Sequence, residues 1–171
     1  MQMENVTPLT DHPHYQFNTR CGVCGREASV HETETPDRLK FAHCAACGFF
    51  KQWPYMEDRL INSTPYLDSL TIRRNDREFY CATSLNLISD VQVYLKTIFL
   101  GLLPGGKFEL HANICNEPPD FSNESIFHRN VHTTYTLACL VGVVTRAGFC
   151  IQVLEENKGV VALTAYKPLV V

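Results

Sequence analysis

Two pairs of cysteines near the start of the chain have the spacing of a metal site. Cys21 and Cys24 form the motif CGVC, Cys44 and Cys47 form CAAC, and nineteen residues separate the two pairs. Two residues between thiolates let one tight turn present both sulfurs to a tetrahedral ion. The pattern therefore predicts that Cys21, Cys24, Cys44 and Cys47 hold one metal ion together.

The predicted site is closed and structural. Four sulfur ligands leave no coordination position for water, so the expected ion is a Zn²⁺ that stabilises the fold and activates no nucleophile. Gly25 and Gly48 directly follow the two pairs and relieve the backbone at each turn. The alternatives are four ordinary reduced thiols or a redox CxxC. His43 could replace a ligand, but two complete pairs make this unnecessary, and His31 is expected to be solvated.

Composition limits what kind of protein this is. The chain has 171 residues, 45% of them hydrophobic and 19% charged, with a formal net charge of -3. These values are typical of a folded globular protein and lack the basic excess of a dedicated nucleic-acid binder. No stretch is long and apolar enough to span a membrane, and the N-terminus lacks the pattern of a signal peptide. We expect a soluble, cytoplasmic protein whose eight cysteines are reduced.

Four segments follow one another along the chain. Residues 1–18 are polar and aperiodic and are expected to form a flexible arm. Residues 19–54 are dense in turn residues around the cysteines and are expected to form a zinc-ribbon module, too short to be stable without its metal. Residues 55–76 are expected to be a linker, and residues 77–171 to form an α/β domain.

The last segment has regular hydrophobic patterning. The predicted order is β-α-β-α-β-β, with a strand at 78–84, a helix at 91–102, a strand at 107–114, a helix at 132–146 and a hairpin at 149–168. Ser89 or Asp90 can cap the first helix, and the PGG at 104–106 ends it. This order indicates an α/β sheet.

Three pieces of the chain carry a family resemblance. They are CGVCG with HCAACGFFKQWP, REFYCATSLNLISDVQVYLKTIFLGLLPGGKFELHANI, and HTTYTLACLVGVVTRAGFCIQV with VVALTAYKP. They resemble the zinc-ribbon-bearing class I S-adenosylmethionine-dependent methyltransferases, a group that includes sugar C-methyltransferases. The first piece is similar to the family's ribbon, the second to its fourth strand, helix and fifth strand, and the third to its final helix and hairpin. The resemblance implies a partial Rossmann-like methyltransferase sheet behind a zinc ribbon.

The sequence departs from the family where the cofactor should bind. The family holds S-adenosylmethionine on a glycine-rich turn after its first strand, where the backbone must approach the ligand closely. This chain has no glycine between Gly48 and Gly101. The segment before residue 78 is also too short for three βα units, and no acidic residue is placed to hold a ribose. The cofactor-binding half is therefore expected to be missing, and S-adenosylmethionine is not an expected cofactor.

A missing half would expose a strand that the family buries. The fourth strand of the family's sheet lies between the first and the fifth, so Glu78–Ser84 is expected to be an open edge. An open edge must be paired, covered or charged. We expect it to pair with a second copy of the chain, with a partner protein, or with the linker and ribbon folded back over it. Two-fold self-pairing is preferred, because it rebuilds a continuous sheet.

Histidines are the weak candidates for catalysis. His111, at the end of a predicted strand, and His128 and His132, before the second helix, fall where the family places substrate-facing residues, and they could act as general bases. Without a bound methyl donor, a general base has no reaction to assist. Histidines in loops are usually solvated or cap a helix. No catalytic residue is therefore assigned.

Other cysteines, aromatics and arginines have both structural and functional interpretations. Four further cysteines lack metal-ligand spacing and are expected to act as small core hydrophobes; they are Cys81, Cys115, Cys139 and Cys150.

The aromatic side chains after the second cysteine pair either cover the ribbon or form a recognition surface, and packing is favoured. They are Phe49, Phe50, Trp53 and Tyr55. Arginines 73, 74 and 77 either contact a phosphate or an acidic partner or form a solvated face, with the solvated face favoured.

The leading functional hypothesis is a non-catalytic protein. A zinc-stabilised methyltransferase remnant would bind another protein and regulate or inhibit it. The alternative is an S-adenosylmethionine-dependent methyltransferase whose cofactor site is completed by a partner chain. A weaker alternative is a nucleic-acid-binding zinc ribbon that uses aromatics for stacking and arginines for phosphates. No membrane partner is expected.

Overall fold

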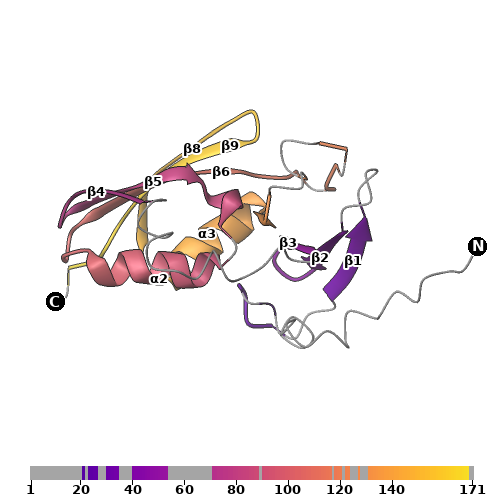
Figure 1. The fold of residues 1–171 in the computed structure, drawn as a ribbon, viewed down its shortest axis with the longest axis horizontal. Coiled ribbons are helices and arrows are strands. Elements are labelled where there is room, and N and C mark those ends of the chain that lie inside the picture. The colour runs from indigo at the N-terminus through magenta and orange to yellow at the C-terminus, as the bar shows by residue number, and fades with distance from the viewer. Residues whose placement is uncertain are drawn as a thin grey trace, which may run out of the picture.

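The computed structural model describes most of the chain from Cys21 onward. The described residues are 21, 23–26, 30–34, 40–53, 71–88, 90–116, 118–120, 122–123, 127 and 131–169. The expected arm at 1–18, most of the expected linker and His128 lie outside them. The described residues form a mixed α/β structure with two sheets (Figure 1).

The first sheet, which we call the ribbon sheet, contains three strands around the cysteine pairs and one strand from much later in the chain. Strands β1 (Val30–Glu34), β2 (Lys40–Cys44) and β3 (Phe49–Trp53) pair antiparallel in that order. Strand β7 (Thr133–Thr134) then pairs antiparallel with β3. The ribbon sheet is therefore completed by residues of the C-terminal half, which the sequence-based division into segments did not foresee.

The second sheet has five strands in the order β4-β5-β6-β9-β8. Its strands are β4 (Thr71–Asn75), β5 (Glu78–Ser84), β6 (Lys107–Asn113), β8 (Cys150–Asn157) and β9 (Val160–Tyr166). Only β5 and β6 are parallel, and every other pair is antiparallel. The strands predicted at 78–84, at 107–114 and in the hairpin at 149–168 are confirmed to within a residue or two at their ends.

The prediction that Glu78–Ser84 forms an exposed edge is wrong. Strand β4 pairs antiparallel with β5 on the side away from β6, so β5 has a neighbour on each side. The two strands are joined by a tight turn at Asp76 and Arg77, in which the backbone N–H of Arg77 donates to Asn75 Oδ1 at 2.7 Å. The end of the expected linker thus folds back and covers the strand, the third of the expected solutions.

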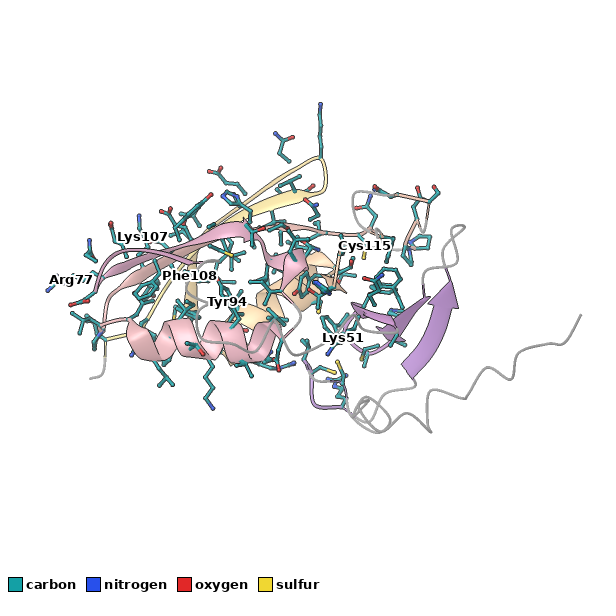
Figure 2. The ribbon with its side chains drawn as sticks, viewed as in Figure 1. Lys51, Arg77, Tyr94, Lys107, Phe108 and Cys115 are labelled. Atoms are coloured by element: carbon teal, nitrogen blue, oxygen red, sulfur yellow. The ribbon has the colours of Figure 1, made fainter. Side chains whose placement is uncertain are left out.

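Two helices cover one face of the five-stranded sheet (Figure 1). Helix α2 (Val91–Gly101) begins at an Asp90 cap, whose carboxylate accepts from Val93 N at 3.1 Å. Tyr94 of α2 points toward Phe108 of β6, with ring centroids 6.3 Å apart (Figure 2). Neither described helix combines the length and apolar character that crossing a membrane requires.

Helix α3 (Leu137–Arg146) starts five residues later than the predicted start at His132. Thr133 and Thr134 belong to strand β7, and the side chain of Thr136 caps the helix by accepting from Cys139 N at 3.2 Å. The hydrophobic period alone cannot place this start, because pairing with β3 competes with helix formation for the same residues.

The opposite face of the five-stranded sheet carries none of the described helices. Along β6, Phe108, Leu110 and Ala112 are buried beneath the helices, while the alternate residues are only half-buried. The same alternation places Val160 and Tyr166 of β9 on the uncovered face, where both are exposed. We refer to this surface as the open face.

Lys167 joins the end of the chain to the end of α2. Its ammonium group donates to the carbonyl oxygens of Phe99 at 2.9 Å and Leu102 at 2.8 Å, and it lies 4.7 Å from the centroid of the Phe99 ring.

We expect Lys167→Met to lower the free energy of unfolding by about 2 kcal/mol, because two charge-assisted bonds to helix-terminal carbonyls are lost. Urea denaturation measures this. Lys96→Met, on the exposed side of α2, is the control; equal losses in the two variants would contradict the assignment.

Candidate metal centre

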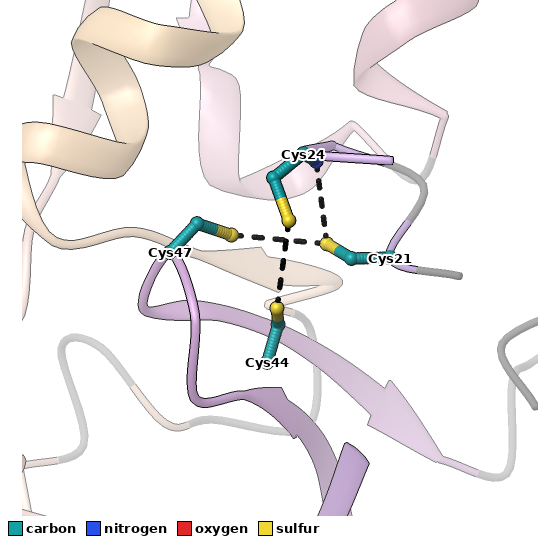
Figure 3. Close-up of side chains that lie close together, drawn as sticks. All are labelled: Cys21, Cys24, Cys44 and Cys47. Atoms are coloured by element: carbon teal, nitrogen blue, oxygen red, sulfur yellow. Dashed lines mark hydrogen bonds between the residues drawn. The ribbon is translucent and has the colours of Figure 1, made fainter. Parts of the chain in front are cut away.

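The structure brings the four predicted cysteines together. Their sulfur atoms all lie within 4.8 Å of one another (Figure 3). Cys21 Sγ is 3.7 Å from Cys47 Sγ, and Cys24 Sγ is 3.8 Å from Cys44 Sγ. A tetrahedral ion with metal–sulfur bonds of about 2.3 Å places its ligands about 3.8 Å apart. These separations fit a tetrathiolate site, and they are far longer than the roughly 2 Å of a disulfide bond. The cluster could hold a metal such as zinc.

Each cysteine pair forms the same type of turn. The amide of Gly25 donates to the Cys21 carbonyl at 2.8 Å, and that of Gly48 donates to the Cys44 carbonyl at 2.9 Å. Both glycines have a positive φ, 66° and 72° respectively, which a residue with a side chain adopts only at a cost. In the first turn, the amide of Val23 also points at Cys21 Sγ, at 3.4 Å. Amides that point at sulfur favour the thiolate form that a metal needs.

The thiols of Cys21, Cys44 and Cys47 nevertheless have raised pKa values without a metal. The pKa of Cys21 is raised by its hydrogen bond with Cys47 and by burial, and the pKa of Cys44 is raised chiefly by burial. The pKa of Cys47 is raised first by a hydrogen bond with the Cys139 thiol. Clustered thiols cannot all ionise in a buried site unless a cation compensates them. Metal binding at these residues therefore releases protons, and the affinity falls as the pH falls.

Helix α3 holds both cysteine turns. The hydroxyl of Thr136, its N-cap, donates to the Cys47 carbonyl at 3.4 Å. A Cβ on Gly48 would lie 2.5 Å from Thr136 Cγ2, so the second turn packs against this cap without space between them. At the other end of α3, the guanidinium of Arg146 donates to the Val23 carbonyl in the first turn. The metal centre is thus fixed to the C-terminal half of the chain by direct contacts.

The ribbon also shares its hydrophobic core with the five-stranded sheet. Cys21, Cys44 and Phe49 belong to the same buried cluster as Leu110 of β6 and Leu163 of β9. The other side of the ribbon sheet is covered by a second cluster, which is composed of Phe41, Phe50, Cys115 and Phe127. Phe49 and Phe50 are therefore packed, as expected, and they offer no exposed rings for stacking on bases. Trp53 and Tyr55 have no described side chains.

A buried asparagine links the two sheets, and the sequence analysis missed it. Asn86 is 1% exposed and lies in a short 3-10 turn, η3 (Leu85–Leu87), directly after β5. Its Nδ2 donates to the carbonyls of Asn113 at 2.9 Å and Thr133 at 3.0 Å, and its Oδ1 accepts from Asn113 N at 2.7 Å and Ser84 Oγ at 2.8 Å. The one sequence signal is an asparagine in an otherwise apolar run, LNLI.

The candidate histidines do not form one site. His111 lies on the open face of β6, where its Nε2 is 3.1 Å from the hydroxyl of Tyr80 on β5. His132 is half-buried between the two sheets, and burial followed by the nearby charge of Lys51 lowers its pKa. His43 stacks on Phe50 at 4.1 Å between centroids and is not among the clustered ligands. The structure thus places His111 and His132 apart, on the open face and beside the ribbon sheet respectively.

The remaining cysteines match the expected packing role. Cys81, Cys115 and Cys139 are buried, and Cys150 is half-buried at the start of β8. Cys139 differs from the others because its amide and the Cys47 carbonyl bond to the same Thr136 hydroxyl.

Comparisons with known proteins give structural likenesses alone. No protein-family model and no curated protein matches the sequence. The structure is similar to an S-adenosylmethionine dependent methyltransferase from Mesorhizobium loti, with a TM-score of 0.46 and 17% identity over 59% of this chain and 67% of that one. It is also similar to human N-acetylserotonin methyltransferase, solved in complex with SAM, with a TM-score of 0.38 and 20% identity over 46% of this chain and 25% of that one. Similarity at this level describes the arrangement of strands and helices and implies no shared activity.

Proposed function

We propose that this protein is a zinc-stabilised, methyltransferase-like module that does not bind S-adenosylmethionine by itself and acts by binding another protein. The observation that carries the proposal is the antiparallel β4–β5 hairpin. In a parallel α/β sheet, ligands bind beyond the carboxyl ends of adjacent parallel strands. Strand β4 lies beside β5, on the side away from β6, and runs antiparallel to it. This position therefore does not hold a parallel strand that a cofactor-binding turn could follow.

A second feature supports the absence of a cofactor site. The carboxyl ends of β5 and β6, the one parallel pair among the described strands, are closed by Asn86, whose side chain bonds to the backbone of Asn113. Beyond them, Ile114 forms an isolated parallel bridge with Tyr135, which is fully buried. These contacts at the carboxyl ends of the strand pair support the proposal that no nucleotide binds there.

The open face is the surface that we propose for the partner. Val153, Val160 and Tyr166 lie on it and are 44%, 46% and 37% exposed. These exposed apolar groups, on a sheet face that none of the described helices covers, are the observation from which we infer the contact surface. The open face replaces Glu78–Ser84 as the proposed contact, because β4 already pairs with that strand.

Calorimetric titration with S-adenosylmethionine tests the first half of the proposal. We expect no saturable heat at micromolar protein, with or without one equivalent of zinc. Saturable micromolar binding would contradict the proposal and favour an active methyltransferase. Binding that requires a second polypeptide would favour an enzyme completed by a partner chain.

Affinity capture with point variants tests the second half. A partner captured by the wild-type chain should be lost by a Val153→Glu/Tyr166→Ser double variant, because both changes lie on the open face. It should be retained by Leu100→Glu, which alters a 70% exposed leucine on α2. Loss in the leucine variant with retention in the double variant would place the contact elsewhere. A complex that weakens steeply with salt and contains nucleic acid would favour the nucleic-acid alternative.

A further inference from the structure

Two strands of the five-stranded sheet have a neighbour on one side only. In the described part of the chain, β4 pairs with β5 and β8 pairs with β9, and no further strand follows either of them in the sheet. A strand at the edge of a sheet keeps a row of backbone N–H and C=O groups on its outer side, and these groups can pair with another chain. The outer sides of β4 and β8, which we call the two edges, are therefore positions where a strand can be added.

The two edges carry charges of opposite sign. Strand β4 has the sequence TIRRN, in which the charged residues are Arg73 and Arg74. Strand β8 has the sequence CIQVLEEN, in which the charged residues are Glu155 and Glu156, and both are exposed. Like charges on facing strands are destabilising, and opposite charges stabilise the pair. The edges of two copies therefore repel when they are alike, and they attract when the β8 of one copy meets the β4 of the other.

The directions of the strands also fit such a contact. Strands β5 and β6 are parallel, whereas β4 is antiparallel to β5, β9 is antiparallel to β6, and β8 is antiparallel to β9. Strands β4 and β8 therefore run in opposite directions. When two sheets lie side by side in the same orientation, β8 of the first is antiparallel to β4 of the second. In this arrangement the helices of both copies cover the same side, and the two open faces become one surface.

We propose that copies of this chain associate head to tail, with the β8 edge of one copy pairing antiparallel with the β4 edge of the next. Register irregularities between Arg73 and Asn75 and between Ile151 and Val153 interrupt the two strands, so the contact is assigned to the strands and to no single residue register. Because the contact joins two different surfaces, each copy keeps a free edge for another copy, and the products are rings or open chains. The open face remains free for the proposed partner, and self-pairing does not require that partner.

Sedimentation velocity of the full-length chain, loaded with one equivalent of zinc, tests the proposal. We expect a series of species, from dimer to trimer and larger, that grows as the protein concentration rises from micromolar to near-millimolar. High salt should weaken the association, because exposed charge pairs are screened. A chain that stays monomeric over this range, or that stops at a dimer, would overturn the proposal.

Charge reversal identifies the two edges. The variant Glu155→Lys/Glu156→Lys has two basic edges, and the variant Arg73→Glu/Arg74→Glu has two acidic edges. Each variant alone should associate about tenfold more weakly than the wild type. An equimolar mixture of the two variants should recover the association, because every contact then joins a basic edge to an acidic one. Loss of association without recovery in the mixture contradicts head-to-tail pairing.

Two further variants separate edge charge from local folding. The carboxylate of Glu156 accepts from Gly159 N at 3.0 Å, so its reversal also removes a bond of the β8–β9 turn. Glu155→Lys alone keeps that bond and should still weaken the association, about threefold. Lys96→Glu reverses an exposed charge on α2 and should associate as the wild type does. Equal association of Glu155→Lys and Lys96→Glu would show that the β8 charges play no part, and the proposal would be wrong.

Discussion

Removing the metal is expected to unfold both sheets together, and not the ribbon alone. The cysteines share one buried cluster with Leu110 and Leu163 of the five-stranded sheet, and α3 bonds to both cysteine turns. Structural zinc contributes on the order of 10 kcal/mol in small zinc modules, which is comparable with the whole stability of a domain. Circular dichroism during heating, with and without a strong chelator, should show one cooperative transition that disappears or shifts to much lower temperature.

Hydrogen exchange locates the effect of metal removal. Amides of β6 and β9, which pair in the middle of the five-stranded sheet, should lose protection together with those of β2 and β3. Cys44→Ser should reproduce the effect of the chelator, and Cys150→Ser, a half-buried cysteine outside the cluster, should leave the wild-type pattern. Protection that persists in β6 and β9 after chelation would show instead that the ribbon unfolds as an independent module.

Asn86→Ala is expected to have the second-largest effect. The substitution removes four hydrogen bonds and leaves the partly buried amide of Asn113 and the buried carbonyl of Thr133 without their side-chain partner. Each buried polar group left unsatisfied costs about 1–3 kcal/mol, so we expect the free energy of unfolding to fall by about 3 kcal/mol. Urea denaturation of the metal-loaded protein measures the change.

Two comparisons separate the network from a general effect of losing an amide. Asn86→Asp keeps the shape but places an oxygen against two carbonyls, so it should destabilise the protein at least as much as alanine does. Asn116→Ala, at an exposed asparagine beyond β6, should change stability by less than about 0.5 kcal/mol. A small effect of Asn86→Asp would show that hydrogen bonding is not what this residue contributes.

The features that the sequence predicted well depend on neighbours in the chain. Two CxxC turns, each followed by a glycine with positive φ, form from a few consecutive residues. The helix at 91–101 and the hairpin at 150–166 follow from hydrophobic period, an aspartate cap and a tight turn. In each case the residues that specify the element lie within it or directly beside it.

The features that were missed depend on pairing between distant residues. The segment Thr71–Asn75 has no alternating apolar pattern, so the sequence predicts a linker there. It forms strand β4 because β5 offers an unpaired edge. Thr133 and Thr134 pair with β3, about eighty residues earlier, and this delays the start of α3. Asn86 has a role only because Asn113 and Thr133 present backbone groups to it.

By itself, then, the sequence predicted the four cysteines that cluster and the main elements of the α/β half. Only the tertiary structure decided that the strand at 78–84 is not an open edge, that the cysteine pairs share a core with the second half, and that Asn86 bonds to Asn113 and Thr133. The reason is physical. Turn and helix preferences act over a few residues, whereas edge pairing, core sharing and contacts between side chains require segments that meet only after folding.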